Sequence, residues 1–406
     1  MVGIKLVNHK KETNNKIKEY LKPKYVYFKI NESDELLIKE NDTVLMGEKI
    51  IKTKYGSFIH SSVSGKFIGI EDKIDYKNNI NKFVKIENDY KETNKFKEIS
   101  VTNKEEFVNL LKEYGIVGLG GAGFPSFIKY NVDDVKTLIV NGVECEPYIT
   151  SDYITLFNNI KEIISTLDLI GKIYNLEEIF IAIKGYNRNL KEKIIPMLRK
   201  YPKIHVIPVP NLYPMGWEKS LVRYIKHVDY DSLPIEKNII VSNASTIYSI
   251  NEALNGKPLV EKIVTVSGNA IKNPTNIKIK IGTVFSELKE IFGGYNFDDI
   301  TLVSGGPMMG EAISSDDFVI PNNLNSIIAL KRIKNIDPIT CLRCGKCIDN
   351  CPQKICPVLV KDNINDKEEL KRLNVNKCIE CGICSFVCPS KINLREYLRE
   401  AKKKVK

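Results

Sequence analysis

The sequence predicts a protein of several domains that mixes α/β and α+β architecture and ends in a compact cysteine-rich domain. Three observations predict it. The N-terminal quarter consists of short β-rich runs separated by turn residues, the middle alternates strand-like with helix-like segments, and one four-cysteine pattern occurs twice near the C-terminus. With 406 residues and 43% hydrophobic content, the chain is long enough to build two to four separate cores.

The first 100 residues predict a small β-domain. Residues 25–30 form a run of aromatic and β-branched side chains that is typical of a strand. Turn signals follow at Asn41-Asp42, Met46-Gly47 and Ser64-Gly65. Their spacing predicts a β-sandwich of the kind seen in lipoyl carriers, spanning residues 1–100.

Residues 101–258 predict an α/β layer. Strand-like runs occur at residues 137–140, 179–183, 204–209 and 239–241, and helix-like runs occur at residues 160–169 and 220–225. This alternation is typical of a Rossmann-like sheet. From residue 259 to 335 the strands are short again and surround one helix at residues 284–291. That pattern predicts a compact α+β module of β-grasp size, and the cysteine-rich domain follows over residues 336–406.

The cysteine-rich domain repeats one ligand pattern, C-x2-C-x2-C-x3-C-P. The first run contains Cys341, Cys344, Cys347 and Cys351, and the second contains Cys378, Cys381, Cys384 and Cys388. This spacing binds two [4Fe-4S] clusters in bacterial ferredoxins, where the fourth cysteine of each run ligates the other cluster. We therefore expect Cys388 to complete the first cluster and Cys351 the second. Structural zinc and disulfides are the alternatives, but zinc favours separated cysteine pairs, and no secretory signal directs the chain to an oxidising compartment.

Two cysteines remain outside these runs. Neither Cys145 nor Cys356 has a partner in a matching motif. Cys356 is close in sequence to the first run, so it is either an additional thiol near a cluster or a small apolar residue that packs against it. The second interpretation is the more common for a free cysteine.

Composition excludes several classes of function. The formal charge is +11, but lysine, isoleucine and asparagine are abundant along the whole chain, and no basic patch interleaved with aromatic residues is present. We therefore expect no nucleic-acid partner. No apolar run approaches the ~20 residues of a membrane span, so we expect no transmembrane segment. Ligation by free thiolates indicates a cytoplasmic location, with peripheral attachment at the inner face of the membrane as the alternative.

A glycine-rich loop carries a second signal. Gly118, Gly120 and Gly123 give a formal G-x-G-x-x-G pattern with a further glycine at 121, and Glu144 lies about 20 residues beyond the loop. A dinucleotide fingerprint requires a strand leading into the first glycine, whereas here an amphipathic helix precedes it. The residues support a more general expectation. The backbone of this loop approaches a phosphate or a planar ring without a Cβ atom in the way.

Together these segments resemble the C subunit of the Rnf electron-transport complex and, more distantly, the NADH-oxidising flavoprotein subunit of respiratory complex I. The resemblance covers nearly the whole chain. It is carried by residues 60–65, 118–125 with Lys129, 141–149 with Asp152, 213–219, 243–246 and 304–310, and by the tandem cysteine runs. It implies an Rnf-type barrel-sandwich hybrid domain, an FMN domain, a β-grasp module of the SLBB type and a two-cluster ferredoxin domain.

The resemblance also implies roles for individual residues. The candidate FMN contacts are Gly118, Gly120, Gly121, Gly123, Lys129, Asn141, Glu144, Asn243 and Thr246. Phe124 and Glu146 become candidates for the nicotinamide side, and Tyr213 and Glu218 for the wall between the two ligands. The alternatives are structural ones. The glycines could mark a tight turn, Lys129 a surface charge, Glu146 a carboxylate at a helix start, and Asn243 with Thr246 a helix cap.

The implied activity is that of an oxidoreductase that passes electrons from NADH through FMN and two [4Fe-4S] clusters to an acceptor protein. That acceptor is either the other Rnf subunits or a reductase. Two N-terminal elements of the Rnf pattern are replaced here by residues 7–10 and 30–33. This departure favours a soluble relative, such as the electron-transfer protein associated with proline reductase or a cobalamin reductase. An adaptor that has clusters but binds neither flavin nor NADH is the alternative of a different class.

Overall fold

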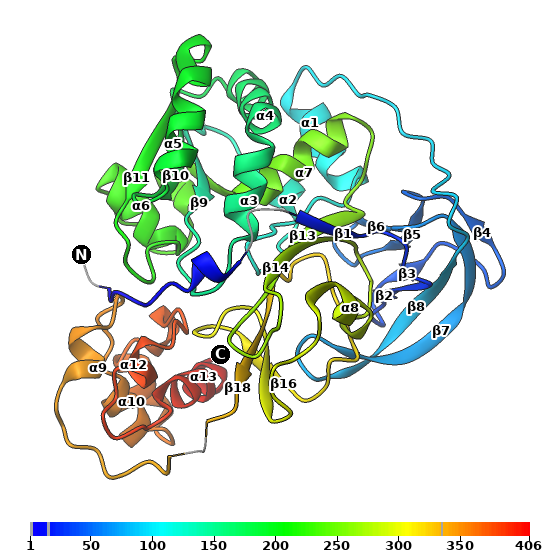
Figure 1. Cartoon of the computed structure of the whole chain (residues 1–406). Coiled ribbons are helices and arrows are strands. Elements are labelled where there is room, and N and C mark those ends of the chain that lie inside the picture. Colours follow the sequence, from blue (N-terminus) through cyan, green and yellow to red (C-terminus); the bar gives the residue numbers. More distant parts are fainter. Residues whose placement is uncertain (1–2, 14–16, 334–335) are drawn as a thin grey trace.

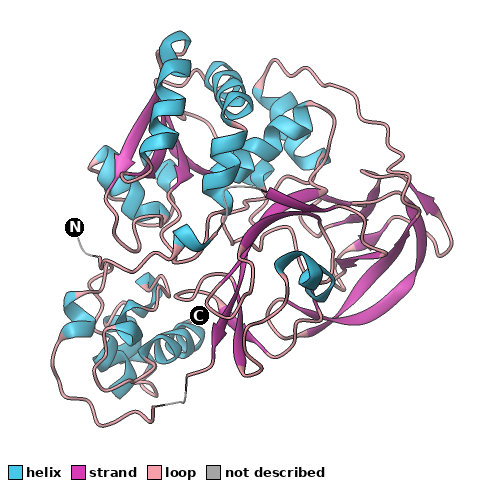
Figure 2. Ribbon diagram, in the orientation of Figure 1, coloured by secondary structure: helices cyan, strands magenta, loops and turns pink. Residues whose placement is uncertain are grey.

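The computed structural model describes residues 3–13, 17–333 and 336–406. Figure 1 shows the α/β domain in green above the cysteine-rich domain in orange and red, with the N-terminal β-domain in blue and cyan on the other side of a central yellow sheet. The N-terminal segment, which contains the 3₁₀ turn η1 (Lys10–Glu12), passes between the green and the orange parts. Helices gather in the α/β and cysteine-rich domains, as Figure 2 shows, whereas the rest is built mainly of strands.

The N-terminal β-domain consists of two small sheets. The larger has the order β17-β7-β8-β2, in which β17 (Phe318–Val319) comes from much later in the chain and β4 (Thr43–Val44) also pairs with β7. The smaller has the order β3-β5-β6. The strands are β2 (Tyr25–Lys29), β3 (Glu35–Leu36), β5 (Lys49–Lys52), β6 (Phe58–His60), β7 (Gly65–Asp75) and β8 (Ile80–Asn88). Val26, Val84 and Ile86 have no exposed surface, so the inward faces of this sandwich form a closed core. The predicted sandwich is confirmed.

The α/β domain contains a four-stranded sheet of order β11-β10-β9-β12, in which every pair is parallel. Its strands are β9 (Thr137–Gly142), β10 (Glu178–Lys184), β11 (Ile204–Val209) and β12 (Ile239–Asn243). All four predicted strands are therefore present. The order reverses between β9 and β12, and in open parallel sheets ligands bind outside the carboxyl ends of the strands at such a reversal.

Helices connect and cover these strands. Their bounds are α1 (Lys104–Glu113), α2 (Ser126–Tyr130), α3 (Ser151–Asn158), α4 (Ile160–Ile173), α5 (Arg188–Ile194), α6 (Glu218–Lys226) and α7 (Ala244–Leu254), with 3₁₀ turns η2 (Ile195–Lys200) and η3 (Pro234–Lys237). Helix α4 is amphipathic, and its face with Ile163, Leu167 and Ile170 is buried. The helix expected before the glycine loop is α1, so the loop precedes the first strand of the sheet rather than following one.

The central six-stranded sheet joins the domains together. Its order is β1-β14-β13-β18-β15-β16. The strands are β1 (Ile17–Tyr20), β13 (Glu261–Ser267), β14 (Thr275–Lys280), β15 (Ile300–Ser304), β16 (Glu311–Ile313) and β18 (Ser326–Lys331). Strand β1 comes from the N-terminal segment and pairs with β14, whereas β17 (Phe318–Val319) leaves this region to pair with β7. The predicted single helix is divided into the 3₁₀ turn η4 (Phe285–Leu288) and α8 (Lys289–Phe292).

The cysteine-rich domain is made of short helices packed on the C-terminal one. They are α9 (Lys346–Asp349), α10 (Pro357–Asp362), α11 (Lys367–Arg372), η5 (Val375–Lys377), α12 (Ile383–Phe386) and α13 (Leu394–Val405). Leu394, Leu398 and Ala401 of α13 are buried in its core. Helix α13 is tied to the second cysteine run, because Lys402 donates to the Cys378 carbonyl oxygen at 2.9 Å and pairs with Glu380. Within the described ranges, none of the helices has both the length and the apolar character that crossing a bilayer requires.

Candidate functional site

Hydrogen bonds within the loop and two from distant parts of the chain hold the glycine loop. The Leu119 amide donates to the Thr246 hydroxyl at 2.9 Å, at the start of α7. The Asn323 side-chain amide donates to the Gly121 carbonyl oxygen at 2.8 Å, from the central sheet region. Within the loop, the Gly118 amide donates to the Phe124 carbonyl oxygen at 2.8 Å. The loop is therefore fixed in shape before any ligand binds.

The glycines serve both the turn and the approach of a ligand. Gly121 and Gly123 have φ values of 116° and 64°, in the left-handed region that only glycine occupies freely. A Cβ atom at Gly121 would meet nothing within 4 Å, so its face is open, whereas a Cβ atom at Gly123 would lie 3.1 Å from the Asn323 amide. The Phe124 ring at the end of the loop is 47% exposed. We refer to the open glycine face, the uncovered aromatic ring and the nearby start of α7 as the cradle.

The start of α7 lies against the loop, because the Leu119 amide binds the Thr246 hydroxyl and Gly120 lies beside Asn243. The Asn243 side-chain oxygen caps α7 by accepting from the amides of Ser245 and Thr246. Its amide group donates to the Asp152 carboxylate at 2.6 Å, and the Ser245 hydroxyl donates to the same carboxylate at 2.7 Å. Burial, followed by the nearby Glu144, raises the pKa of Asp152 to about 7. Asn243 is thus a helix cap, which is the alternative role that the sequence left open for it. It also holds the start of α7 beside Gly120.

Residues at the carboxyl end of β9 hold neighbouring loops. The Glu144 carboxylate accepts from the amides of Asp152 at 2.7 Å and Tyr153 at 3.2 Å, so it caps α3. The Asn141 side-chain amide donates to the Gly216 carbonyl oxygen at 2.7 Å. These two groups position the backbone around the cradle, and the side-chain atoms named here are already paired within the protein.

Lys129 and Glu218 form an ion pair behind the loop. Their charged atoms are 3.4 Å apart, and the Lys129 ammonium also donates to the Val241 carbonyl oxygen at 2.8 Å, near the end of β12. Glu218 accepts from the Tyr230 hydroxyl as well. Lys129 is therefore held in place at the sheet edge and is not an unpaired surface charge.

Tyr213 and Glu146 link the α/β domain to other parts of the chain. Tyr213 is 1% exposed, and its hydroxyl donates to the Cys381 carbonyl oxygen at 2.7 Å. The two Glu146 carboxylate oxygens accept from the amides of Met308 at 3.0 Å and Met309 at 2.9 Å. Both side chains thus join the α/β domain to other parts of the chain, Glu146 to the loop of residues 305–310 and Tyr213 to the cysteine-rich domain. Sequence spacing could not show this, because Cys381 is 168 positions from Tyr213.

Burial raises the pKa of Glu146 to about 7, against the smaller opposing effects of the two backbone amides, Arg395 and Lys10. The folded chain therefore favours the protonated carboxyl group, and this contribution to stability is present at pH 4.5 and lost as the pH rises through about 7. The unfolding free energy of the wild type should fall between pH 5 and pH 8 as Glu146 ionises. We expect this fall to be smaller in Glu146→Gln by about 1–2 kcal/mol, which is less than the full pKa shift would give because the side chain is partly exposed. Chemical denaturation of both proteins at several pH values measures this difference. An equal slope in both would contradict the prediction.

The cysteines gather around two separate cavities. The first is lined by Cys341, Cys344, Cys347 and Cys388, together with Cys356. The second is lined by Cys378, Cys381, Cys384 and Cys351. Each cavity therefore combines three cysteines of one run with the fourth cysteine of the other, which is the crossed arrangement that the spacing predicts.

Each cavity offers at least four thiols, which is the number of ligands that a [4Fe-4S] cluster takes. In the described part of the chain, no three histidine, cysteine or acidic side chains are arranged to hold one metal ion. A zinc site would bring four sulfur atoms to one centre at about 2.3 Å each. Here the thiols surround a void instead, and all ten cysteines are free of disulfides. The two cavities differ in exposure, because Cys344 is exposed in the first whereas Cys381 and Cys384 are buried in the second.

A third cavity lies at the carboxyl edge of β9 and β10. It is lined by Lys10, Glu144, Lys184, Tyr186 and Asn187, among others, and the N-terminal segment forms part of its wall. The Lys10 ammonium donates to the carbonyl oxygens of Glu144 and Ile149. Burial lowers the pKa of Lys184 to about 8. No sequence signal marked these lysines, because they come from separate segments that only the fold brings together.

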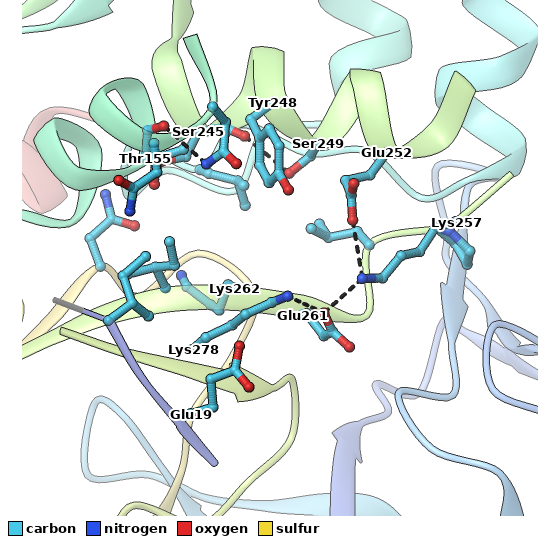
Figure 3. A pocket seen from close by; sticks show the side chains of 18 residues that line it. Glu19, Thr155, Ser245, Tyr248, Ser249, Glu252, Lys257, Glu261, Lys262 and Lys278 are labelled. Carbon is cyan, nitrogen blue, oxygen red and sulfur yellow. Dashed lines mark hydrogen bonds and ion pairs between the residues drawn. The ribbon is translucent and has the colours of Figure 1, made fainter. Parts of the chain in front are cut away.

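Figure 3 shows a further cavity, between α3, α7 and the central sheet. Four of its charges pair with one another: Lys257 lies 3.0 Å from Glu252 and 2.7 Å from Glu261, and Lys278 lies 3.1 Å from Glu261. It reaches the glycine loop only at Leu119 and contains none of the predicted site residues. We interpret it as a junction between domains.

Comparison with known proteins agrees with this architecture. Four family models match: the RnfC barrel sandwich hybrid domain over residues 1–91, the Nuo51 FMN-binding domain over 111–252, the SLBB domain over 263–312 and the 4Fe-4S dicluster domain over 333–389. The predicted fold class, with its four kinds of domain, is confirmed.

Similar curated proteins decide the family. The C subunit of the proton-translocating ferredoxin:NAD(+) oxidoreductase complex of Clostridium ljungdahlii is 32% identical over 345 residues, covering 80% of this chain and 74% of that protein. The chain belongs to the RnfC family. The C subunit of the ion-translocating oxidoreductase complex of Buchnera aphidicola is 33% identical to this RnfC-family chain and covers 83% of this chain and 74% of that protein. The resemblance inferred from the motifs is thus confirmed.

Solved structures support the fold of this RnfC-family chain. A NAD⁺-reducing [NiFe]-hydrogenase in the air-oxidised state is similar, with a TM-score of 0.53 at 13% identity, covering 75% of this chain and 63% of that chain. At this identity the similarity concerns the fold alone. It extends over the larger part of the chain, which agrees with the four family models.

Proposed function

We propose that this chain transfers electrons from NADH through FMN and two [4Fe-4S] clusters to an acceptor protein. The observation that carries this proposal is the contact between the flavin-type α/β domain and the second cysteine cavity. Through Tyr213 and Cys381 the two domains meet in a buried apolar cluster that also contains Met308 and Ile383, with Cys145 packed against it.

The cradle between the glycine loop and the start of α7 is the proposed FMN site. The open face at Gly121 admits a planar group, and the α7 N-terminus beside Gly120 favours a phosphate. When bound, a flavin accepts two electrons as a hydride and passes them on singly, which is what one-electron clusters require. The protein's part is to keep this cradle rigid, through Thr246, Asn323 and the Asn243 cap.

We assign NADH to the side of the cradle that carries Phe124. The exposed phenyl ring offers a surface on which a nicotinamide or adenine ring can stack. The cavity with Lys10, Lys11 and Lys184, at the carboxyl ends of β9 and β10, supplies positive charge for the phosphates of the dinucleotide. In this assignment Glu146 and Tyr213 do not touch the nicotinamide, because they hold the domains together.

The two clusters then follow one another on the path of the electrons. The site of Cys378, Cys381, Cys384 and Cys351 is the inner one, because Cys381 is buried against the α/β domain. The site of Cys341, Cys344, Cys347 and Cys388 is the outer one, because Cys344 is exposed to solvent. The acceptor protein therefore docks on the outer site. The name of the Clostridium ljungdahlii relative includes ferredoxin and NAD(+), so we propose the other subunits of such a complex as partners, located at the membrane surface.

The direct test is anaerobic purification followed by metal, sulfide and flavin analysis. We expect about eight irons and eight acid-labile sulfides per chain, with one FMN released on denaturation. NADH should then bleach the cluster absorbance. Clusters without any flavin, before or after reconstitution with FMN, would favour the adaptor that binds neither flavin nor NADH. One zinc per run and no sulfide would overturn the whole proposal.

A further inference from the structure

One cluster cavity contains more thiols than a cluster can use. A [4Fe-4S] cluster has four irons, and each takes one protein ligand. The inner cavity is lined by four cysteines, whereas the outer cavity is lined by five, the fifth being Cys356. The inference below rests on the proposed function only in assuming that both cavities hold clusters.

Cys356 faces the outer cavity because of the backbone at the start of α10. It has extended dihedral angles, with φ −98° and ψ 90°, and it precedes Pro357 at the first helical position. In extended backbone, successive side chains point to opposite sides. Ile355 and Pro357 accordingly line the inner cavity, while Cys356 and Val358 line the outer one. Residues 355–358 are therefore the partition between the two cavities, and the thiol of Cys356 faces the outer cavity.

The Cys356 thiol does not stabilise the start of α10 by capping it. As the N-cap residue of α10 it makes no side-chain hydrogen bond to the helix. Cys341 and Cys344 lie in one loop and Cys347 follows it at the start of α9, so this stretch contributes three ligands and takes three irons of the outer cluster. Only the fourth iron is left for a ligand from elsewhere. Cys388, from the second run, and Cys356, from the partition, both reach the cavity from outside that stretch.

We propose that Cys356 is an alternative fourth ligand of the outer cluster, able to replace Cys388. In the exchange the Cys356 thiol loses its proton to water and its sulfur bonds the iron, while the Cys388 sulfur leaves the iron and takes up a proton. The charge of the cluster is unchanged and no electron moves. The outer cluster, whose Cys344 is exposed, thus survives the loss of Cys388, and the inner cluster, with four thiols, does not survive the loss of Cys351.

The experiment compares the fourth ligand of each cavity in the full chain. Cys388→Ala should keep about eight irons and eight sulfides, because Cys356 takes its place, with a shifted electron paramagnetic resonance spectrum for the outer cluster. Cys351→Ala, the matched change in the inner cavity, should fall to about four irons. Cys356→Ala alone should keep about eight, and the double variant Cys388→Ala with Cys356→Ala should fall to about four.

Each outcome decides between the two roles of Cys356. If Cys388→Ala loses iron as Cys351→Ala does, Cys356 is only a packing residue and the inference is wrong. If Cys388→Ala and the double variant both keep eight irons, some other ligand completes the cluster and the inference is again wrong. Should Cys388→Ala not accumulate in cells, the same four proteins are unfolded and reconstituted with ferrous iron and sulfide. Wild-type protein without eight irons would instead contradict the proposed function, which separates the two failures.

Discussion

Gly120→Val is expected to lower the affinity for FMN by at least about 100-fold, equivalent to about 2.7 kcal/mol, while leaving the iron content of the chain unchanged. Gly120 does not have a positive φ, so valine at this position does not strain the backbone. A Cβ atom here would meet only the Asn243 side chain, at 3.5 Å, so the protein itself has room for it. The two methyl groups of valine would instead extend beyond this Cβ atom into the cradle that we assign to the cofactor.

The measurement is flavin content after purification together with titration of the apoprotein with FMN. Gly120→Ala is the control for added bulk, and it should bind FMN with an intermediate affinity. The clusters of Gly120→Val should remain reducible by dithionite and should no longer be bleached by NADH. Flavin content equal to that of the wild type would place the FMN site elsewhere, and bleaching by NADH in the flavin-free protein would contradict the proposed order of transfer.

Removing Cys351 is expected to interrupt electron transfer between the flavin and the outer cluster. Although Cys351 belongs to the first run, it lines the cavity of the second. Cys351→Ala should therefore lose the inner cluster, about four of eight irons, and keep the outer one. NADH should still reduce the flavin but should no longer reach the outer cluster, which dithionite should still reduce. Anaerobic NADH titration followed by visible and paramagnetic resonance spectroscopy measures both steps.

Double variants test the crossed ligation by iron content alone, so that the spectrum of neither cluster has to be assigned. If Cys351 and Cys378 ligate one cluster, the variant that lacks both should keep about four irons, as each single variant does. If each run binds its own cluster, the double variant should lose nearly all iron. Cys145→Ala is the matched control, because Cys145 packs at the same junction, lines neither cluster cavity and should keep eight irons.

Elements that depend on local patterns are predictable from the sequence. Strands β9, β10 and β12 have apolar runs that the parallel sheet buries on both faces, and all four strands of the sheet lie close to the predicted bounds. The crossed cysteine sets are also predictable, because the spacing of thiolates around a cubane is fixed by its chemistry. The glycine loop is recognisable for a similar reason, since φ values of 116° and 64° favour glycine.

Contacts between distant segments are not predictable in this way. The sequence neighbours of Tyr213 indicate the cofactor wall, but its hydroxyl binds a carbonyl of the cysteine-rich domain. Asn323 holds the glycine loop from 202 residues away, and an isolated asparagine carries no pattern that would reveal this. Lys10 and Lys184 meet only because the N-terminal segment lies across the sheet edge. In each case tertiary packing, rather than local propensity, decides the role.

The exchange of strands in the central sheet limits how this protein can be divided. Strand β1 pairs with β14, far along the chain, and β17 pairs with β7 of the N-terminal sandwich. A fragment cut between the family-model boundaries would expose unpaired strand edges, which promote aggregation. Truncation from the N-terminus past Tyr20 would strip an edge strand from the module that holds Asn323 against the glycine loop. Evolutionary recombination of this chain would therefore have to move its modules together, and biochemical dissection is better done by point substitution than by excision.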